Sequence, residues 1–312
     1  MASLKEVKQR ISSVRSTLHI TSAMKMVSAA KLHHAQQAIQ GMHPYEEKLH
    51  SILTDLLASE EVRGAGESVA LYTQNPARPT QEEGQPVAHP RVAIVVFSSN
   101  SSLCGSFNAN VIKHFKALVE ELLQQGFSND EMDVYAIGKK VAAVARKQGF
   151  VQKEDFSHLA EHPNYAEASA LGRKLMADYA EGHIGRVILL YNHYASNSSQ
   201  PTLQQTWLPL NVNDASFSSS ASATTADVAE QLIVEPSASE LIRELLPKVL
   251  LQKIYTVLVD ANAAEHAART VAMQIASDNA EKLLDELTLE YNKTRQQKIT
   301  SEILDLVGGL QR

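Results

Sequence analysis

Few positions in this 312-residue chain combine the residue types and spacing that catalysis or ligand binding needs. The loop SSNSSLCGSFN follows the apolar run 92–97, where a doubly wound domain places its nucleotide-binding turn. It lacks the glycine spacing of dinucleotide and P-loop motifs, and Gly138-Lys139-Lys140 lacks the preceding glycine. We therefore expect no bound nucleotide and no other cofactor.

The remaining candidates for chemistry are also weak. Cys104 is the single cysteine, and no histidine base is evident beside it, so we predict a small buried core residue. His33, His34 and His43 lack the i, i+4 spacing of a helical metal site and are expected on solvated helix faces. Neighbouring acids such as Glu46-Glu47 point in different directions. We predict no catalytic residue and no metal site.

Composition excludes several protein classes. Hydrophobic residues make up 44%, which is too many for a disordered chain. One cysteine favours a reducing compartment. No apolar run reaches the roughly 18–20 residues that span a bilayer. Aromatic residues are only 5%, which favours helices over sheets.

Charge is uneven along the chain. The net charge is −6, yet residues 1–40 hold six Lys or Arg against one Glu, a net of +5. Global acidity argues against a general nucleic-acid binder. The basic start indicates either a transit peptide or a helix that faces an acidic surface.

Both ends of the chain show helical periodicity. From residue 4 to 57 apolar residues recur every three or four positions, with a stutter after Thr21 carried by Met24 and Val27. Gly41 and Pro44 predict a kink or short break. About 50 residues would span roughly 80 Å, so this helix needs a partner along its length.

The partner is expected at the other terminus. Residues 238–310 keep a similar stripe, which includes Ile254, Ala268 and Ile275, with Leu283 and Leu284 further on. Small residues recur in both segments and would bring the helix axes close together. They are Ser22, Ala23, Ser28, Ala29 and Ala30 in the first, and Ala261, Ala264, Ala268, Ala272 and Ala276 in the second. The two segments predict an antiparallel two-helix coiled coil.

The middle of the chain alternates strand and helix patterns. Strands are predicted at 92–97, 132–137, 150–156, 187–191 and 202–210, with helices at 111–123, 140–148 and 166–179. This alternation is typical of a doubly wound α/β (Rossmann-like) domain. The predicted organisation is a coiled-coil helix at 1–62, a linker at 63–90, an α/β domain at 91–212, a Ser-rich insertion at 213–237 and a second coiled-coil helix at 238–312.

Three segments resemble one known family. TLHITSAMKMVSAAKLHHAQQ at 17–37 and AARTVAMQIASDNAEKLLDELTLEYNKTRQQKITSEILDLVGG at 267–309 are similar to the terminal signatures of the gamma subunit of F-type ATP synthase. The central LCGSFNANV resembles that family's loop after the first strand. Order, spacing and length agree over nearly the whole chain.

The resemblance implies a non-catalytic rotor shaft of a proton-translocating ATP synthase. Its helices would turn inside a hexamer of alpha and beta subunits, and its α/β domain would touch the epsilon subunit and the membrane c ring. It would be a peripheral protein on the cytoplasmic face of a bacterial inner membrane, at one copy per complex. The similarity begins near Leu4, which argues against a transit peptide.

Family motifs also imply particular contacts. Coupling contacts with the hexamer are expected from Met24, Lys25, Arg269, Arg295, Gln296, Thr300 and Glu302. Arg269, Arg295 and Gln296 would form a catch on one beta subunit. A hydrophobic shaft tip is expected from Ile303, Leu306, Val307 and Leu310.

Some residues depart from the family pattern, and other functions stay open. His33-His34 replaces a common basic pair, and Asn100-Ser101-Ser102 replaces a common Asp-Arg-Gly, which puts that loop's role in doubt. The paired regulatory cysteines of chloroplast members are absent from the sequence. The alternatives are a coiled-coil adaptor, a basic-helix nucleic-acid binder, and an α/β enzyme with helical arms.

Overall fold

The computed structural model describes residues 3–58, 72, 90–152, 154–210, 235 and 237–309. Contacts divide the chain into two units. The helix-pair unit comprises residues 1–30 and 269–312, and the sheet unit comprises residues 31–268. The predicted linker 63–90 and Ser-rich segment 213–237 fall almost wholly outside the described residues, so the predicted domain division stays a prediction.

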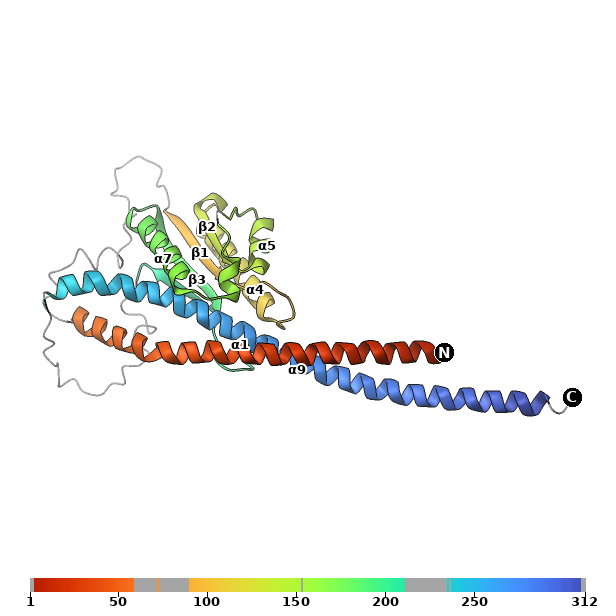
Figure 1. Ribbon diagram of the computed structural model, residues 1–312. Helices are drawn as coiled ribbons and strands as arrows, with labels where there is room; N and C mark the ends of the chain where they lie inside the picture. The colour runs from red at the N-terminus through yellow and green to blue at the C-terminus, as the bar shows by residue number, and fades with distance from the viewer. Residues whose placement is uncertain are drawn as a thin grey trace. The chain divides into compact units, whose positions relative to one another are not determined.

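Two long helices contribute to both units. Helix α1 runs over Leu4–Ala58 and α9 over Ala238–Gly309, as the terminal periodicities predict. Of the kink or short break predicted at Gly41 and Pro44, the break does not occur, because α1 continues through both residues. Proline removes only one backbone hydrogen bond, so the helix bends in its orange portion (Figure 1) without ending.

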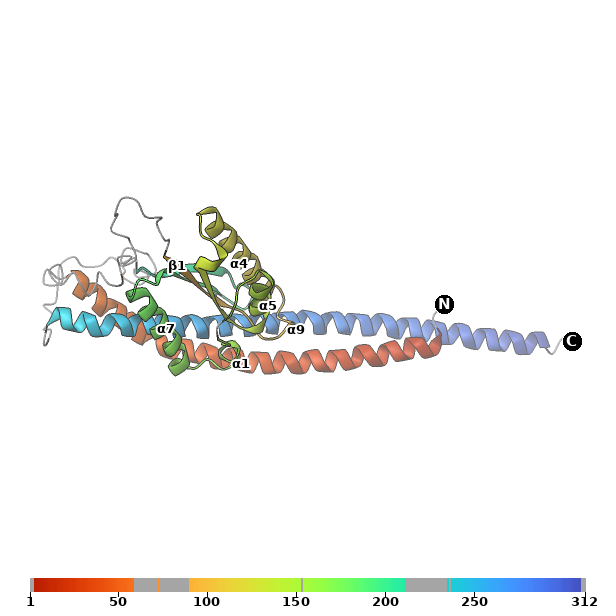
Figure 2. The same ribbon diagram turned by 90° about the horizontal axis from the view of Figure 1, so that it is seen from above.

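Within the helix-pair unit, α1 and α9 run antiparallel (Figure 2). Thr21 and Ser277 share a buried hydrogen bond of 2.8 Å between their hydroxyl oxygens. Lys25 Nζ donates to Gln274 Oε1 at 2.7 Å. Contacts nearer the C-terminus of α1 are therefore made by residues nearer the N-terminus of α9. The predicted stripe is the covered side of α1, at Leu4, Val7, Ile11, Val14, Leu18 and Thr21.

Beyond Thr21 the predicted phase of the stripe is wrong in places. Val27 is 58% exposed, whereas its neighbour Ser28 is 3% exposed and takes the buried position. On α9, the predicted Ile275 and Leu283 are exposed, whereas Met273, which lies off the predicted stripe, is buried. A step of four in place of three moves the buried face by one residue, which composition alone cannot reveal. Three of the small residues expected between the helices, Ala23, Ala29 and Ala30, are likewise exposed.

The sheet unit contains a four-stranded sheet of order β2-β1-β3-β4. Strands β1 (Arg91–Phe97), β2 (Met132–Ile137) and β3 (Ile184–Asn192) are parallel, and β4 (Thr202–Leu208) pairs antiparallel with β3. β1 lies inside the sheet and is apolar on both faces, as its continuous apolar run predicts.

Helices cover both faces of this sheet (Figure 1). Val95 and its alternate neighbours face a cluster with α7 and with α9 from Ile242 to Ala261. Ile94 and its neighbours face α4 and α5. The predicted α/β fold, doubly wound with flanking long helices, is confirmed, with β4 as an antiparallel edge. The remaining helices are α4 (Phe107–Gln124), the 3-10 turn η1 (Asn129–Glu131), α5 (Lys139–Lys147), α6 (Ser157–Glu161) and α7 (Tyr165–Ala180).

The strand predicted at 150–156 is wrong. Its described residues form a loop, in which Phe150 is buried and Glu154 and Asp155 are exposed. Asp155 Oδ1 accepts a hydrogen bond of 2.8 Å from Ser157 N at the start of α6. The polar run Gln152 to Asp155 has no strand-like alternation and ends in a turn at the start of a helix.

Candidate functional site

The loop after β1 holds the amino end of α5. Lys139 N donates to Asn100 Oδ1 at 3.0 Å, and Lys140 N donates to Ser99 O at 3.2 Å. Val141 N donates to Ser98 Oγ at 3.0 Å. Free N–H groups at such a helix end are what binds phosphate in nucleotide-binding domains. Here these three are used by the chain itself, which agrees with a structural role for the loop.

Asn100 is the central residue of this loop. Its Nδ2 donates to Ser157 O at 2.7 Å and to Glu161 Oε1 at 2.9 Å, which ties the loop to α6. The bond from Asn100 lowers the pKa of Glu161. A carboxylate at position 100 could not donate either bond. Asparagine, which replaces the family's common aspartate at this position, is therefore the residue that these local contacts require.

Cys104 is buried, as predicted. It packs with Phe107, Ala264 and Ala268, and Asn108 Nδ2 donates to its sulfur at 3.0 Å.

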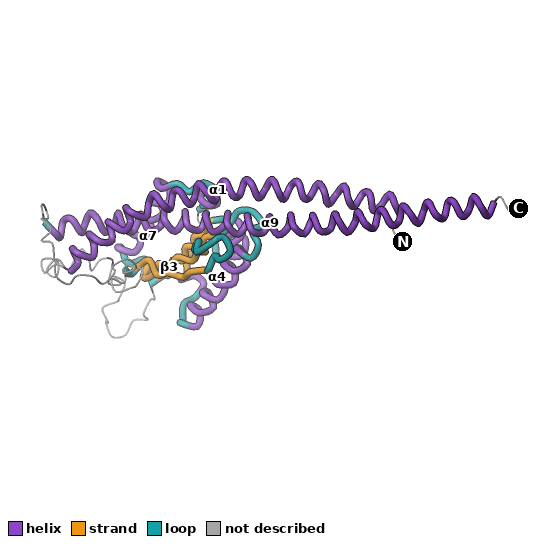
Figure 3. The backbone as a smooth tube through the Cα atoms, turned by 90° about the horizontal axis from the view of Figure 1, so that it is seen from below, coloured by secondary structure: helices purple, strands orange, loops and turns teal. Residues whose placement is uncertain are grey.

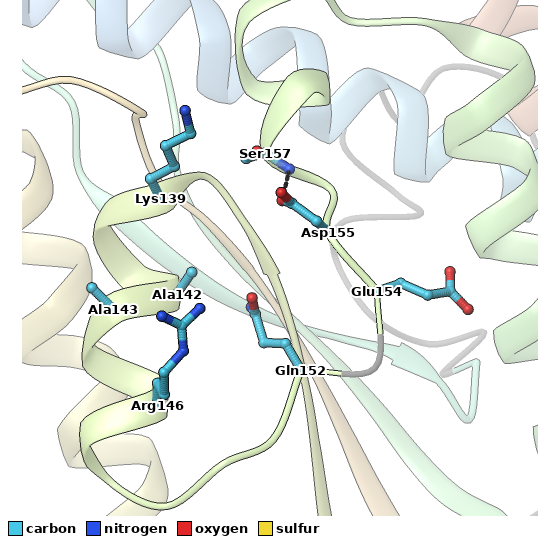
Figure 4. Close-up of a pocket in the computed structure, with 8 residues that line it drawn as sticks. All are labelled: Lys139, Ala142, Ala143, Arg146, Gln152, Glu154, Asp155 and Ser157. Atoms are coloured by element: carbon cyan, nitrogen blue, oxygen red, sulfur yellow. Dashed lines mark hydrogen bonds between the residues drawn. The ribbon is translucent and has the colours of Figure 1, made fainter.

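A cavity of about 460 Å³ lies between α5 and the loop that precedes α6 (Figure 4). Lys139 and Arg146 line it from the helix, and Glu154 and Asp155 line it from the loop, with the Glu154 carboxylate pointing away from α5. Hydrogen bonds from Ser157 lower the pKa of Asp155, so this carboxyl group stays ionised at neutral pH and is no proton donor. The mixed charges and polar walls indicate a solvated groove rather than a catalytic centre.

One group of possible metal ligands occurs among the described residues. Ligand atoms of Asp178, Glu181 and His183 lie within 4.8 Å of one another. The side chains of Glu181 and His183 are exposed, and such acidic surface groups are common without a bound ion. This trio therefore carries no metal assignment.

The predicted coupling residues fall into two groups on the helix pair. Met24 and Lys25 are half-buried on α1, and Lys25 reaches α9 at Gln274. Arg269, five residues before Gln274, is only 8% exposed. Arg295 lies 26 residues further along α9, which corresponds to roughly 39 Å of helix. The structure therefore does not bring Arg269 together with Arg295 and Gln296.

The second group lies on an unpaired part of α9. Seventeen residues back from Thr21 is Leu4, the start of α1, and seventeen forward from Ser277 is Thr294. Every described side chain from Arg295 to Leu306 is exposed, including Gln296, Thr300, Glu302 and Ile303. Only the backbone of Val307 is described, and Leu310 lies outside the described residues. Figure 3 shows the C-terminal end of α9 continuing past the N-terminus.

Apolar residues on the outer face of the helix pair were not among the predicted contacts. On α1, Ile20 and Met26 are largely exposed, together with Val27. On α9, Leu289 is 72% exposed. Ile20, Met26 and Leu289 have a signal in the sequence, because they fall off the a/d stripe although they are as apolar as the residues on it.

Comparison with known proteins decides the family. A family model described as ATP synthase matches residues 3–311. The ATP synthase gamma chain of Bacteroides fragilis is 48% identical over 312 residues, which covers 99% of each chain. The chain belongs to the ATP synthase gamma chain family. The gamma chain of Flavobacterium johnsoniae is 40% identical and covers 99% of this chain and 98% of its own.

A solved structure agrees with the fold. The rotor of the Euglena gracilis mitochondrial ATP synthase aligns with a TM-score of 0.59 at 16% identity, covering 95% of this chain and 98% of that chain. The gamma chain assignment confirms the expectation of a rotor shaft and makes the chain a subunit of the membrane-associated ATP synthase complex. This assignment is preferred to the three alternatives left open by the sequence, which were a coiled-coil adaptor, a basic-helix nucleic-acid binder and an α/β enzyme with helical arms. Among the described residues, no helix has both the length and the apolarity to cross a membrane.

Proposed function

We propose that this gamma chain is the non-catalytic central shaft of an F-type ATP synthase on the cytoplasmic face of a bacterial inner membrane. The helix-pair unit turns inside the hexamer of alpha and beta subunits. The sheet unit contacts the epsilon subunit and the c ring. Rotation driven by proton flow through the ring then changes each beta subunit's nucleotide site in turn.

The observation that carries this proposal is the exposed apolar end of α9. Ile299, Ile303, Leu304 and Leu306 are between 47% and 70% exposed on a helix that α1 no longer covers. Apolar surface concentrated in this way marks a site that another protein covers. Contacts between apolar surfaces are not directional, so a collar of apolar residues can hold this end while it rotates.

The polar residues on the same stretch supply directional contacts. Arg295 and Gln296 are both exposed and adjacent, so they can meet one beta subunit as a catch in one rotor orientation. The burial of Arg269 and its distance along α9 set it apart from this catch. Glu302 pairs with Lys298 at 3.8 Å in an exposed i, i+4 pair, which is a weak restraint. Thr300 Oγ1 donates to Gln296 O at 2.9 Å within the helix.

The basic residues of α1 support an acidic partner. Lys5, Lys8, Arg10 and Arg15 are exposed on the helix-pair unit. Complementary charge steers partners and favours one register over others. An acidic loop of the beta subunit is the expected counterpart.

Stoichiometry tests the assignment directly. The complex is purified through a tag on the beta subunit and weighed intact by native mass spectrometry. We expect one copy of this chain for three alpha and three beta subunits. A different ratio, or loss of the chain at physiological salt, would reject the shaft function.

A double substitution tests the catch. Arg295→Ala with Gln296→Ala should lower ATP synthesis by membrane vesicles several-fold, without loss of the chain from the complex. The matched control is Arg173→Ala with Gln125→Ala, which removes the same side-chain types from exposed positions of α7 and just beyond α4. Unchanged ATP synthesis in the first variant would reject the catch but leave the shaft function standing.

A further inference from the structure

Three consecutive residues at the carboxyl end of β3 hold neighbouring elements together. Asn192, the last residue of β3, is fully buried. Its Nδ2 donates to Phe107 O at the start of α4 at 3.1 Å, and its Oδ1 accepts from Thr202 Oγ1 on β4 at 2.6 Å. The backbone of the next residue, His193, is held by Pro201 O at 2.8 Å. This arrangement fixes the strand end.

The following two residues bind α9 through one carboxylate. Asp260 Oδ1 accepts a hydrogen bond of 2.9 Å from Tyr194 N, and its Oδ2 lies 2.7 Å from His193 Nδ1. The Asp260 side chain is only 12% exposed. Solvent therefore screens this contact less than it screens a surface ion pair.

Tyr194 also reaches α1. Its hydroxyl accepts a hydrogen bond of 2.7 Å from Gln36 Nε2 and donates to Asn197 Oδ1 at 2.7 Å. Its ring packs against two small clusters that involve both long helices. The residues packed there are Leu32, Ala35, Ala263 and Ala267 in one cluster, and Cys104, Phe107, Ala264 and Ala268 in the other.

We propose that Asn192, His193 and Tyr194, with Asp260 and Gln36, form a torque junction that passes rotation of the sheet unit to both long helices. This inference rests on the shaft function proposed above. Gln36 lies six residues after the part of α1 that belongs to the helix-pair unit, and Asp260 lies nine residues before the part of α9 that does.

The chemistry of the junction suits this role. The apolar contacts between α9 and the sheet resist separation, but they are non-directional and yield to sliding. Hydrogen bonds weaken steeply when their angle changes, so they resist rotation of a helix about its own axis. Asp260 and Gln36 place such bonds on both helices, and one tyrosine joins them. These five are positioning residues, since none of them acts on a nucleotide.

Torsional stiffness of the assembled complex tests the junction. The hexamer is fixed to a surface, a bead is attached to the exposed face of α4, and the bead's angle is recorded during the pauses of ATP-driven rotation. The variance of that angle is inversely proportional to stiffness. The variant Asp260→Ala with Tyr194→Phe should raise the variance at least twofold, while ATP hydrolysis by the complex stays close to that of the unmodified chain.

The control has the same chemistry at another place. His158 on α6 pairs with Glu167 on α7, and neither residue lies on a long helix. His158→Gln should leave the variance unchanged. Equal variance in the junction variant and the unmodified chain, or an equal rise in the control, would overturn the proposal.

Two further variants keep the test decisive. Asp260→Glu with Tyr194→Phe retains the carboxylate and should give a smaller rise in variance than Asp260→Ala with Tyr194→Phe. If the double variant does not assemble, Tyr194→Phe alone carries the test, because it keeps the packed ring and removes only the hydroxyl bonds. No rise in variance for Tyr194→Phe would then reject the junction. A bead that does not rotate on the unmodified complex would instead count against the shaft function.

Discussion

Thr21 on α1 and Ser277 on α9 share a hydrogen bond of 2.8 Å, although 256 positions separate them in the chain. Both side chains are buried within the helix-pair unit. Thr21 Oγ1 also lies 3.1 Å from Leu18 O, so the bond between the helices is part of a short chain of polar contacts. This polar pair interrupts the apolar stripe and fixes the register of the two helices.

Removal of one member of this pair should destabilise the helix pair. Thr21→Val leaves the Ser277 hydroxyl buried without its partner, and we expect a loss of about 1–3 kcal/mol in the free energy of unfolding. The double variant Thr21→Val with Ser277→Ala should lose less than the sum of the two single variants. Urea unfolding of the four proteins measures this coupling, and strict additivity would argue against it.

Asn100→Asp should destabilise the sheet unit. The substitution removes both bonds donated by Asn100 Nδ2 and places a second carboxylate beside Glu161. We expect a loss of about 1–3 kcal/mol at pH 7. The loss should shrink near pH 4, where a protonated carboxyl group can donate again. Urea unfolding at both pH values tests this.

The control for Asn100→Asp is Asn110→Asp. Asn110 is exposed in the first turns of α4, and its Nδ2 donates a long hydrogen bond of 3.4 Å to Ser106 Oγ. We expect a change within about 0.5 kcal/mol, as for most surface substitutions. An equal loss in both variants would mean that the Asn100 contacts contribute nothing specific.

Gly138→Ala should prevent stable folding of the sheet unit. A Cβ atom at this position would lie 2.1 Å from the backbone oxygen of Ser98, and the residue has a φ of +107°. Gly149 has a φ of +92° but open space around its Cβ position. Gly149→Ala should therefore cost only the backbone strain, about 1–2 kcal/mol. Circular dichroism and urea unfolding compare the two, and similar stabilities would refute the predicted clash.

The pairing of His193 with Asp260 should make stability depend on pH. The hydrogen bond and charge of Asp260 raise the pKa of His193, whereas partial burial and Lys253 oppose the rise. A raised pKa means that the added stability is fully present below the unfolded value of about 6.5 and is lost as pH rises through the folded value. Unfolding free energy should fall over this window relative to His193→Gln. Parallel pH profiles for the two proteins would contradict the assignment.

Local patterns in the sequence predicted most of the fold. Continuous apolar residues from Val92 to Phe97 predicted a strand buried on both faces, and the structure confirms it. The strand predicted at 150–156 failed because two end phenylalanines outweighed the polar residues between them. Both the correct prediction and the wrong one depended only on residues that are neighbours in the sequence.

The sequence by itself determined the family, the two long helices, the α/β class and the stripe from Leu4 to Thr21, because each depends on neighbouring residues or on long contiguous motifs. Tertiary structure alone decided that Ser28 rather than Val27 is covered, that Arg269 is buried away from Arg295, and that Asp260 joins the end of β3. The physical reason is that helical phase drifts over many turns, so small steps decide which side chains face the partner. Contacts between residues far apart in the chain exist only once the helices have packed.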